Sequence, residues 1–234
     1  MFDISTLTCW FCLIFSSGFF YKLYDVFDFL LNKCFTKYST YDKDRQAYIL
    51  TNILKSFYLV IITLIFIFNL STSNVNLLNT ALWYKHTIFW KSLVAMYAST
   101  DLVGLVLNKK MSVTTIIHHY GVIIGFIIIS FKDFKDEGIY KAIFIYGCFS
   151  ALAFIVNFYL GVRFLTDKNG IIKHIVKKLA FVNYLLVIVF NICWQFYYFV
   201  TTLISLSLFN NIFLIVLVTL WLKDDLILLK FLYN

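Results

Sequence analysis

The chain has 234 residues, of which 62% are hydrophobic and only 14% are charged. A soluble globular domain has about half apolar and about a quarter charged residues, so this composition excludes an ordinary soluble domain. The apolar residues form continuous runs of roughly 20 residues between short polar connectors, which predicts a multi-span helical membrane protein and disfavours a β-barrel. The net charge of +8 lies mostly in the connectors, which indicates membrane topology and argues against nucleic-acid binding.

The runs predict an all-α bundle of about seven transmembrane helices with short loops. In chain order they are residues 7–30, 48–70, 86–107, 113–131, 139–165, 179–201 and 203–222. The last two runs are nearly continuous, so their separation is left open. The first run lacks a basic start and a small-residue cleavage site, and we expect it to be retained. We divide the chain into a first helix with its basic connector (1–44), a membrane domain (45–222) and a short cytoplasmic tail (223–234).

The orientation follows from the distribution of lysine and arginine. The connectors after the first, third and fifth runs carry eleven of these residues, and the other three connectors carry four, when Arg163 and Lys141 are counted with the connectors they adjoin. Cytoplasmic connectors are enriched in Lys and Arg. We therefore expect a lumenal amino terminus and a cytoplasmic carboxyl terminus.

The hairpin between residues 96 and 125 combines three ionisable residues with a very short turn. Asp101 lies nine residues before Lys110, and His119 lies nine residues after it. Two antiparallel helices that leave this turn carry Asp101, His118 and His119 to the same depth, about 10–14 Å inside the membrane at about 1.5 Å per residue. Ionisable groups at that depth are costly and usually functional. We expect Asp101 to pair with an imidazole inside the bundle.

An aspartate bonded to an imidazole orients it and raises its basicity, which suits general-base catalysis. The alternative is that the Asp–His contact only joins two helices. Metal binding is not expected, because adjacent helical histidines point about 100° apart and the chain has only four histidines. No cofactor is expected either. The pair Cys9 and Cys12 is interpreted as two apolar helix residues.

Further polar residues fall near the same level. Asn157 lies six residues before Arg163 and is expected at a similar depth, whereas Thr51, Asn52 and Asn183 are a little shallower. Together they predict a polar layer open towards the cytoplasm. Two lysines, Lys55 and Lys91, are expected to extend to the membrane surface, and Arg163 is expected to lie at the interface.

The pattern Tyr97-x3-Asp101-Leu102, a short turn and then His118 with His119 resembles the TLC domain family, and most closely its small membrane proteins. Residues 154–157, followed by Arg163, also resemble a family segment. The resemblance covers roughly residues 45–222. It implies a bundle in the endoplasmic reticulum or another internal membrane, concerned with lipid metabolism, lipid homeostasis or trafficking.

On this resemblance, the expected catalytic residues are His118, His119 and Asp101, and the expected lipid-binding residues are Asn157, Tyr97 and Ser150. Ceramide synthases of the family also use an aspartate pair about 30 residues downstream of the histidines, and that region of this chain contains no carboxylate. Ser150 stands where the small family members often have glutamate, and Leu54 stands where a histidine is expected. These departures weaken the ceramide synthase interpretation and leave the fold unaffected.

Two functions remain from these observations. The first is a lipid protein that binds a membrane lipid in a cytoplasmic-side cavity; if it is an enzyme, it is an acyl-CoA-dependent N-acyltransferase with a histidine as base and Asp101 orienting it. The alternative is a non-enzymatic trafficking or translocation helper with a structural Asp–His pair. A seven-span transporter or receptor is a third class, which only the number of spans suggests.

Overall fold

The computed structural model describes residues 3–72, 77–78, 80–167, 170–205 and 207–234, and these residues form helices and turns without any strand. The expected all-helical class is therefore confirmed. The long helices are α1 (Ile4–Cys34), α3 (Lys43–Thr72), α4 (Thr87–Leu107), α5 (Val113–Ser130), α6 (Ile139–Leu152), α7 (Phe154–Val162), α8 (Ile171–Thr201) and α9 (Leu208–Tyr233). Short elements are α2 (Thr36–Ser39) and the 3-10 turns η1 (Thr80–His86) and η2 (Leu203–Ser205).

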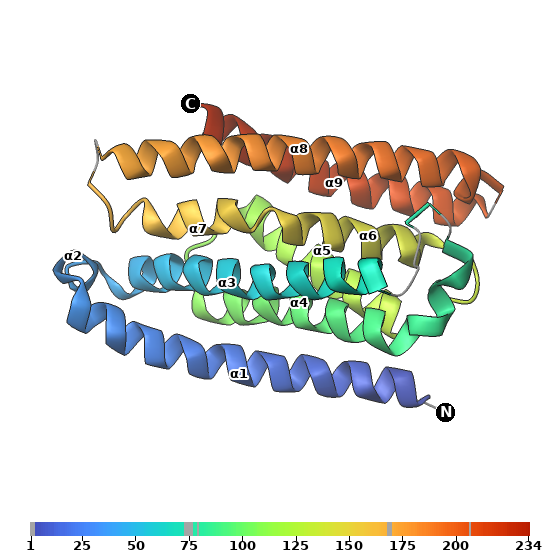
Figure 1. Ribbon diagram of the computed structural model, residues 1–234, viewed down its shortest axis with the longest axis horizontal. Coiled ribbons are helices and arrows are strands. Elements are labelled where there is room, and N and C mark those ends of the chain that lie inside the picture. Colours follow the sequence, from blue (N-terminus) through green and yellow to red (C-terminus); the bar gives the residue numbers. More distant parts are fainter. Residues whose placement is uncertain (1–2, 73–76, 79, 168–169, 206) are drawn as a thin grey trace.

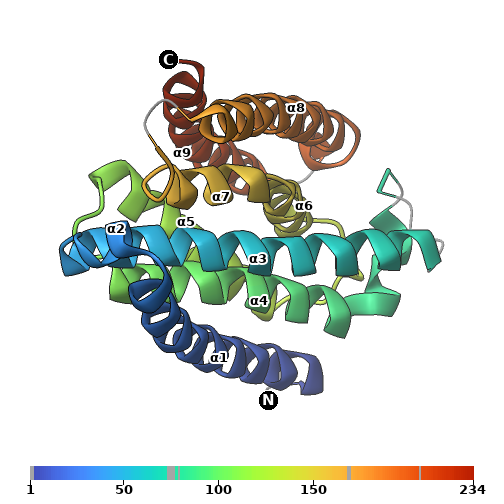
Figure 2. The ribbon, with the colours of Figure 1, turned by 60° about the vertical axis from the view of Figure 1, so that its left-hand side comes forward.

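The long helices run along the longest axis of the molecule, and the two termini lie at opposite ends (Figure 1). The helix α1 lies on one flank beside α4, and α8 with α9 forms the other flank, with α3, α5, α6 and α7 between them (Figure 2). We call the end that contains residues 108–112 and 163–167 the basic end. The end that contains residues 131–138 is called the opposite end.

Four helices, α1, α3, α5 and α8, are long and apolar enough to cross a membrane, and the bent pair α6 and α7 makes a fifth candidate. This agrees with an integral, multi-pass membrane protein. Two further helices, α4 and α9, run alongside them and contain charged residues. Lys91 and Asp101 lie in α4, and Asp224 and Asp225 follow Lys223 in α9.

Several expected boundaries agree closely with the structure. The helix α4 ends at Leu107 and α5 begins at Val113, where Ser112 caps it by accepting a hydrogen bond from the Thr115 amide. The last two runs are separate helices, because α8 ends at Thr201 and α9 begins at Leu208.

Three expectations about the elements were wrong. The helix α8 begins at Ile171 rather than at 179, so Lys173, Lys177 and Lys178 lie on helical turns; Lys168 lies outside the described residues. Residues 223–233 continue α9 instead of forming a tail. The first extension is rich in Lys and the second in Leu, and both residue types favour helix. The fifth run is broken at Ala153, where α6 and α7 meet at 46°.

Two lysines expected near the surface are paired inside the protein. Lys91 is only 1% exposed, and its Nζ donates a hydrogen bond to Ser5 Oγ at 2.7 Å, which joins α4 to α1. Lys55 contacts a carboxylate described below. The reason is the same for both: a partner on a neighbouring helix lies within reach, so neither ammonium needs to extend to water.

A polar cluster joins three segments at the opposite end. Glu137, in the connector before α6, accepts hydrogen bonds from Thr80 Oγ1 at 2.7 Å, Lys141 Nζ at 2.8 Å and Tyr198 OH at 2.7 Å. Its neighbours belong to η1, α6 and α8, so this one carboxylate holds the three segments together. We call these four residues the Glu137 cluster.

Candidate functional site

The centre of the candidate site is Asp101 on α4, whose side chain is fully buried. His119 Nδ1, on α5, lies within a short hydrogen bond of Asp101 Oδ1. The pairing of Asp101 with an imidazole is therefore as expected, because the five-residue turn between α4 and α5 keeps the two residues level. The carboxylate accepts, so Nδ1 carries the proton in neutral His119 and Nε2 is left as the acceptor.

A third helix contributes a residue that sequence reasoning placed elsewhere. Lys55 Nζ, on α3, lies 2.5 Å from the same Asp101 Oδ1, and also lies 5.7 Å from the centre of the Tyr97 ring. The expectation that Lys55 extends to the surface was wrong. Asp101 thus joins α3, α4 and α5, while its second oxygen, Oδ2, is buried without a hydrogen-bond partner among the described residues.

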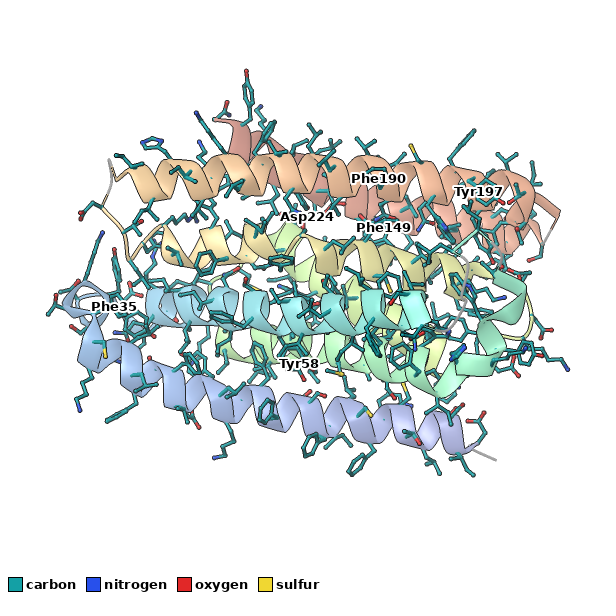
Figure 3. All side chains as sticks on the ribbon, in the orientation of Figure 1. Phe35, Tyr58, Phe149, Phe190, Tyr197 and Asp224 are labelled. Atoms are coloured by element: carbon teal, nitrogen blue, oxygen red, sulfur yellow. The ribbon has the colours of Figure 1, made fainter. Side chains whose placement is uncertain are left out.

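His118 faces a different helix. Its Nδ1 lies 3.3 Å from Asp224 Oδ2, without the angles of a hydrogen bond, and the two imidazole rings of His118 and His119 are nearly perpendicular at 5.8 Å. Asp224 lies part-way along the long axis of the bundle (Figure 3). The two adjacent histidines therefore contact two different carboxylates, Asp101 on α4 and Asp224 on α9.

Asp225 is buried next to this pair. It accepts a hydrogen bond from Tyr184 OH at 2.6 Å and a short one from Tyr146 OH, so α6, α8 and α9 meet at its carboxylate. Asp224 and Asp225 are the site residues that sequence reasoning missed. A signal was present, because apolar residues continue beyond them to Leu232, which is typical of a helix that packs and not of a tail.

These residues surround a cavity of about 420 Å³ inside the bundle. Residues from every long helix except α1 line the cavity. Its wall includes the expected site residues His118, His119, Tyr97, Ser150 and Asn157, and also Lys55, Arg163, Asn52, Asp224 and Asp225. Asp101 does not itself line the cavity, whereas its partners Lys55 and His119 do.

A narrow apolar pocket of about 40 Å³ adjoins the cavity, and Tyr97, His118 and Ser150 belong to both walls. Its other lining residues are almost all apolar, including Ile62 on α3 and Trp221 on α9. The combination of a polar cavity and an apolar pocket suits a ligand with one polar and one apolar part.

The bend at Ala153 shapes the same wall. Ser150, Ala153, Asn157 and Arg163 line the cavity from the two sides of the break. The break has no proline; instead the Ala153 amide bonds to the Ser150 carbonyl, three residues back, which tightens the turn.

The donor set does not suit a metal. Among the described residues, no group of three or more His, Cys, Asp or Glu side chains is placed to hold one. Cys9 and Cys12 contact α4, through the Lys91 carbonyl at 3.4 Å and Ser92 Oγ at 3.6 Å, and do not bond to each other.

Comparison with known proteins adds no relative. No family model, no curated protein and no solved structure matches the chain.

Proposed function

We propose that this chain is a lipid-handling membrane protein, and that its cavity binds an amphiphile for acyl transfer with His119 as the general base. The observation that carries the proposal is the fully buried Asp101, bonded to His119 at the wall of a cavity that continues into an apolar pocket. The resemblance to TLC domain proteins supports the same class, lipid metabolism or lipid homeostasis in the endoplasmic reticulum.

The proposal includes seven membrane spans, with α4 and α9 added to the candidates already described. The buried charges Lys91 and Asp101 of α4 and Asp225 of α9 then face partners within the bundle instead of lipid, which lowers the free-energy cost of spanning. The amino terminus is lumenal and the carboxyl terminus cytoplasmic, so the basic end faces the cytoplasm. An acyl donor such as a coenzyme A thioester would then enter from the cytoplasmic side.

The reaction proposed is transfer of an acyl group from a thioester to an amine. The amine nitrogen attacks the thioester carbonyl, the new C–N bond forms, and the C–S bond breaks. His119 Nε2 takes the proton that leaves the nitrogen and returns it to the thiolate sulfur, so the products are an amide and a thiol. Asp101 is a positioning residue, because it holds Nδ1–H and leaves Nε2 free to act.

The test compares His119→Gln with His174→Gln in cells that make equal amounts of each protein. His174 is an exposed residue of α8 near the basic end and does not line the cavity, so it is the matched control. Loss of the base is expected to lower an acyl-lipid product by roughly 100-fold or more, with no change for His174→Gln. Lipid profiles that are identical for wild type and His119→Gln would exclude the catalytic role.

One observation favours a second candidate, a non-enzymatic helper in trafficking or translocation. Lys55 already neutralises Asp101, so the three residues also serve as a connection between α3, α4 and α5. In that case His119→Gln would lower the melting temperature of the purified protein, leave lipid profiles unchanged, and leave its cross-linked protein partners the same.

A further inference from the structure

The cavity wall contains two cations among its described residues, Lys55 and Arg163, and only one of them has a carboxylate partner. Lys55 pairs with Asp101. Within the described part of the chain, no Asp or Glu oxygen lies within 4 Å of Arg163. A half-buried guanidinium at a cavity wall carries a desolvation cost that an anion would offset.

Aromatic rings hold the Arg163 side chain in place. Its guanidinium carbon lies 4.6 Å from the centre of the Phe231 ring, 4.7 Å from Phe164 and 5.9 Å from Tyr48. Rings orient a guanidinium while leaving its in-plane donors available. The only donation to the described protein is a long one, 3.4 Å from Nη2 to Tyr48 OH, and Nε is buried without a partner.

Neutral donors lie on the same wall. Asn52 and Asn157 both line the cavity, and the Asn157 side chain has no hydrogen bond to the described residues, whereas Asn52 Nδ2 donates to the Tyr48 carbonyl at 2.8 Å. The polar group beside the guanidinium itself is the Tyr48 hydroxyl, and an arginine binds the oxygens of a phosphate through paired N–H donors.

The helix α3 gives the spacing between the parts of the cavity. Tyr48 contacts Arg163, Lys55 contacts Asp101, and Ile62 lines the apolar pocket, so the three levels are seven residues apart. At about 1.5 Å per residue, each step is roughly 10 Å. A ligand that occupies all three levels has an anionic group, a polar linkage and an apolar chain in that order.

We propose that Arg163, with the Tyr48 hydroxyl beside it, forms a binding site for the phosphate of an amphiphile whose chain extends past Asn157 and His119 into the apolar pocket. This inference rests on the proposed function for the direction of the ligand, and it names the class of ligand: a phosphate ester with an apolar chain. The phosphate can belong to a phospholipid head group or to a coenzyme A thioester, because both offer the same oxygens to Arg163.

The test measures binding of dodecyl phosphate to the full chain, purified in an uncharged detergent, by native mass spectrometry. Arg163→Gln is expected to weaken binding tenfold or more, because a charge-assisted hydrogen bond is lost. Arg163→Lys keeps the charge without the paired donors, and is expected to lose affinity several-fold. Arg163→Lys is also the control for misfolding, because its melting temperature is expected to equal that of the wild type.

Arg45→Gln is the matched control. Arg45 stacks on the same Phe164 ring at 4.7 Å, but it is exposed and does not line the cavity. Its removal is expected to change the affinity less than twofold. Equal losses for Arg45→Gln and Arg163→Gln, or no loss for Arg163→Gln, would overturn the site.

Two further arms identify the ligand. An equal concentration of inorganic phosphate should not displace dodecyl phosphate; if it does, the apolar chain adds nothing and the amphiphile class is wrong. Lysophosphatidate and a coenzyme A thioester are then compared as competitors, and the stronger one names the source of the phosphate. If neither compound competes with dodecyl phosphate, the proposed class of ligand is wrong.

The Arg163 site and the proposed reaction can fail separately. Binding of dodecyl phosphate that survives in His119→Gln and is lost in Arg163→Gln supports the site even where no acyl transfer is found. Dodecyl phosphate binding that is unchanged in Arg163→Gln overturns the site and, where acyl transfer is found, leaves the proposed function standing.

Discussion

At the scale of single residues, the main feature is that one oxygen of Asp101 serves two partners. Lys55 Nζ and His119 Nδ1 both donate to Oδ1 from different helices. Removing one member of a buried ion pair leaves the other charge without compensation, which costs far more than the pair contributes. Lys55 and Asp101 should therefore be strongly coupled in stability.

We predict that Asp101→Asn lowers the free energy of unfolding by about 3–5 kcal/mol, because it leaves the Lys55 ammonium unpaired inside the bundle. Replacing both residues, as Lys55→Met with Asp101→Asn, should recover most of that loss. Denaturant unfolding of both single variants and the double variant in detergent measures the coupling. Additive losses would show that the two side chains do not interact in the membrane protein.

At the scale of elements, the bent pair α6 and α7 positions half of the cavity wall, and its contact with α3 is close. A Cβ on Gly161 of α7 would lie 2.8 Å from the Ile49 carbonyl oxygen and 2.5 Å from Ile53 Cγ1. The carbonyl belongs to the backbone of α3 and cannot rotate away. Glycine at 161 therefore sets how closely α7 approaches α3, and with it the place of Arg163.

We predict that Gly161→Ala destabilises the protein by about 1–3 kcal/mol, the usual cost of overpacking, and weakens dodecyl phosphate binding. Gly18→Ala is the control, because nothing lies within 4 Å of a Cβ at that position of α1. It should be neutral or slightly stabilising, since alanine favours helix. Thermal melting of the two variants checks this, and equal melting temperatures would contradict the close contact of α3 with α7.

At the scale of the whole molecule, the two ends differ in charge and in construction. The basic end carries a salt bridge of 2.7 Å between Lys110 and Asp44, which ties the turn before α5 to the start of α3. The opposite end is held by the Glu137 cluster. Burial raises the pKa of Glu137, but hydrogen bonds from Lys141, Thr80 and Tyr198 lower it more, so its pKa lies below the ordinary 4.5.

This direction predicts how stability depends on pH. A carboxyl whose pKa is lowered on folding stabilises the protein fully above its unfolded pKa, and the contribution is lost as pH falls through the folded pKa. The melting temperature of wild type should therefore fall below about pH 4.5, and that of Glu137→Gln should start lower and depend less on pH. Asp136→Asn, an exposed neighbour, is the control and should follow wild type. Parallel curves for wild type and Glu137→Gln would contradict the role of Glu137.

The proposed orientation is tested with Cys34, an exposed thiol at the basic end of α1. In sealed vesicles with their cytoplasmic face outward, a membrane-impermeant maleimide should label Cys34 without detergent. Ser207→Cys, introduced together with Cys34→Ala, places a thiol at the opposite end and should react only after the vesicles are opened. The reverse pattern would overturn the orientation.

The sequence by itself determined the helical class, most helix bounds and the pairing of Asp101 with an imidazole of the His118–His119 pair. These depend on local information: apolar runs define helices, and a five-residue turn keeps α4 and α5 in register. Only the tertiary structure decided that Lys55 pairs with Asp101, that Asp224 and Asp225 line the cavity, and that the fifth run bends at Ala153. These features depend on which distant helices meet, because a buried charge takes the nearest partner in space, and the order of helices along the chain does not specify that neighbour.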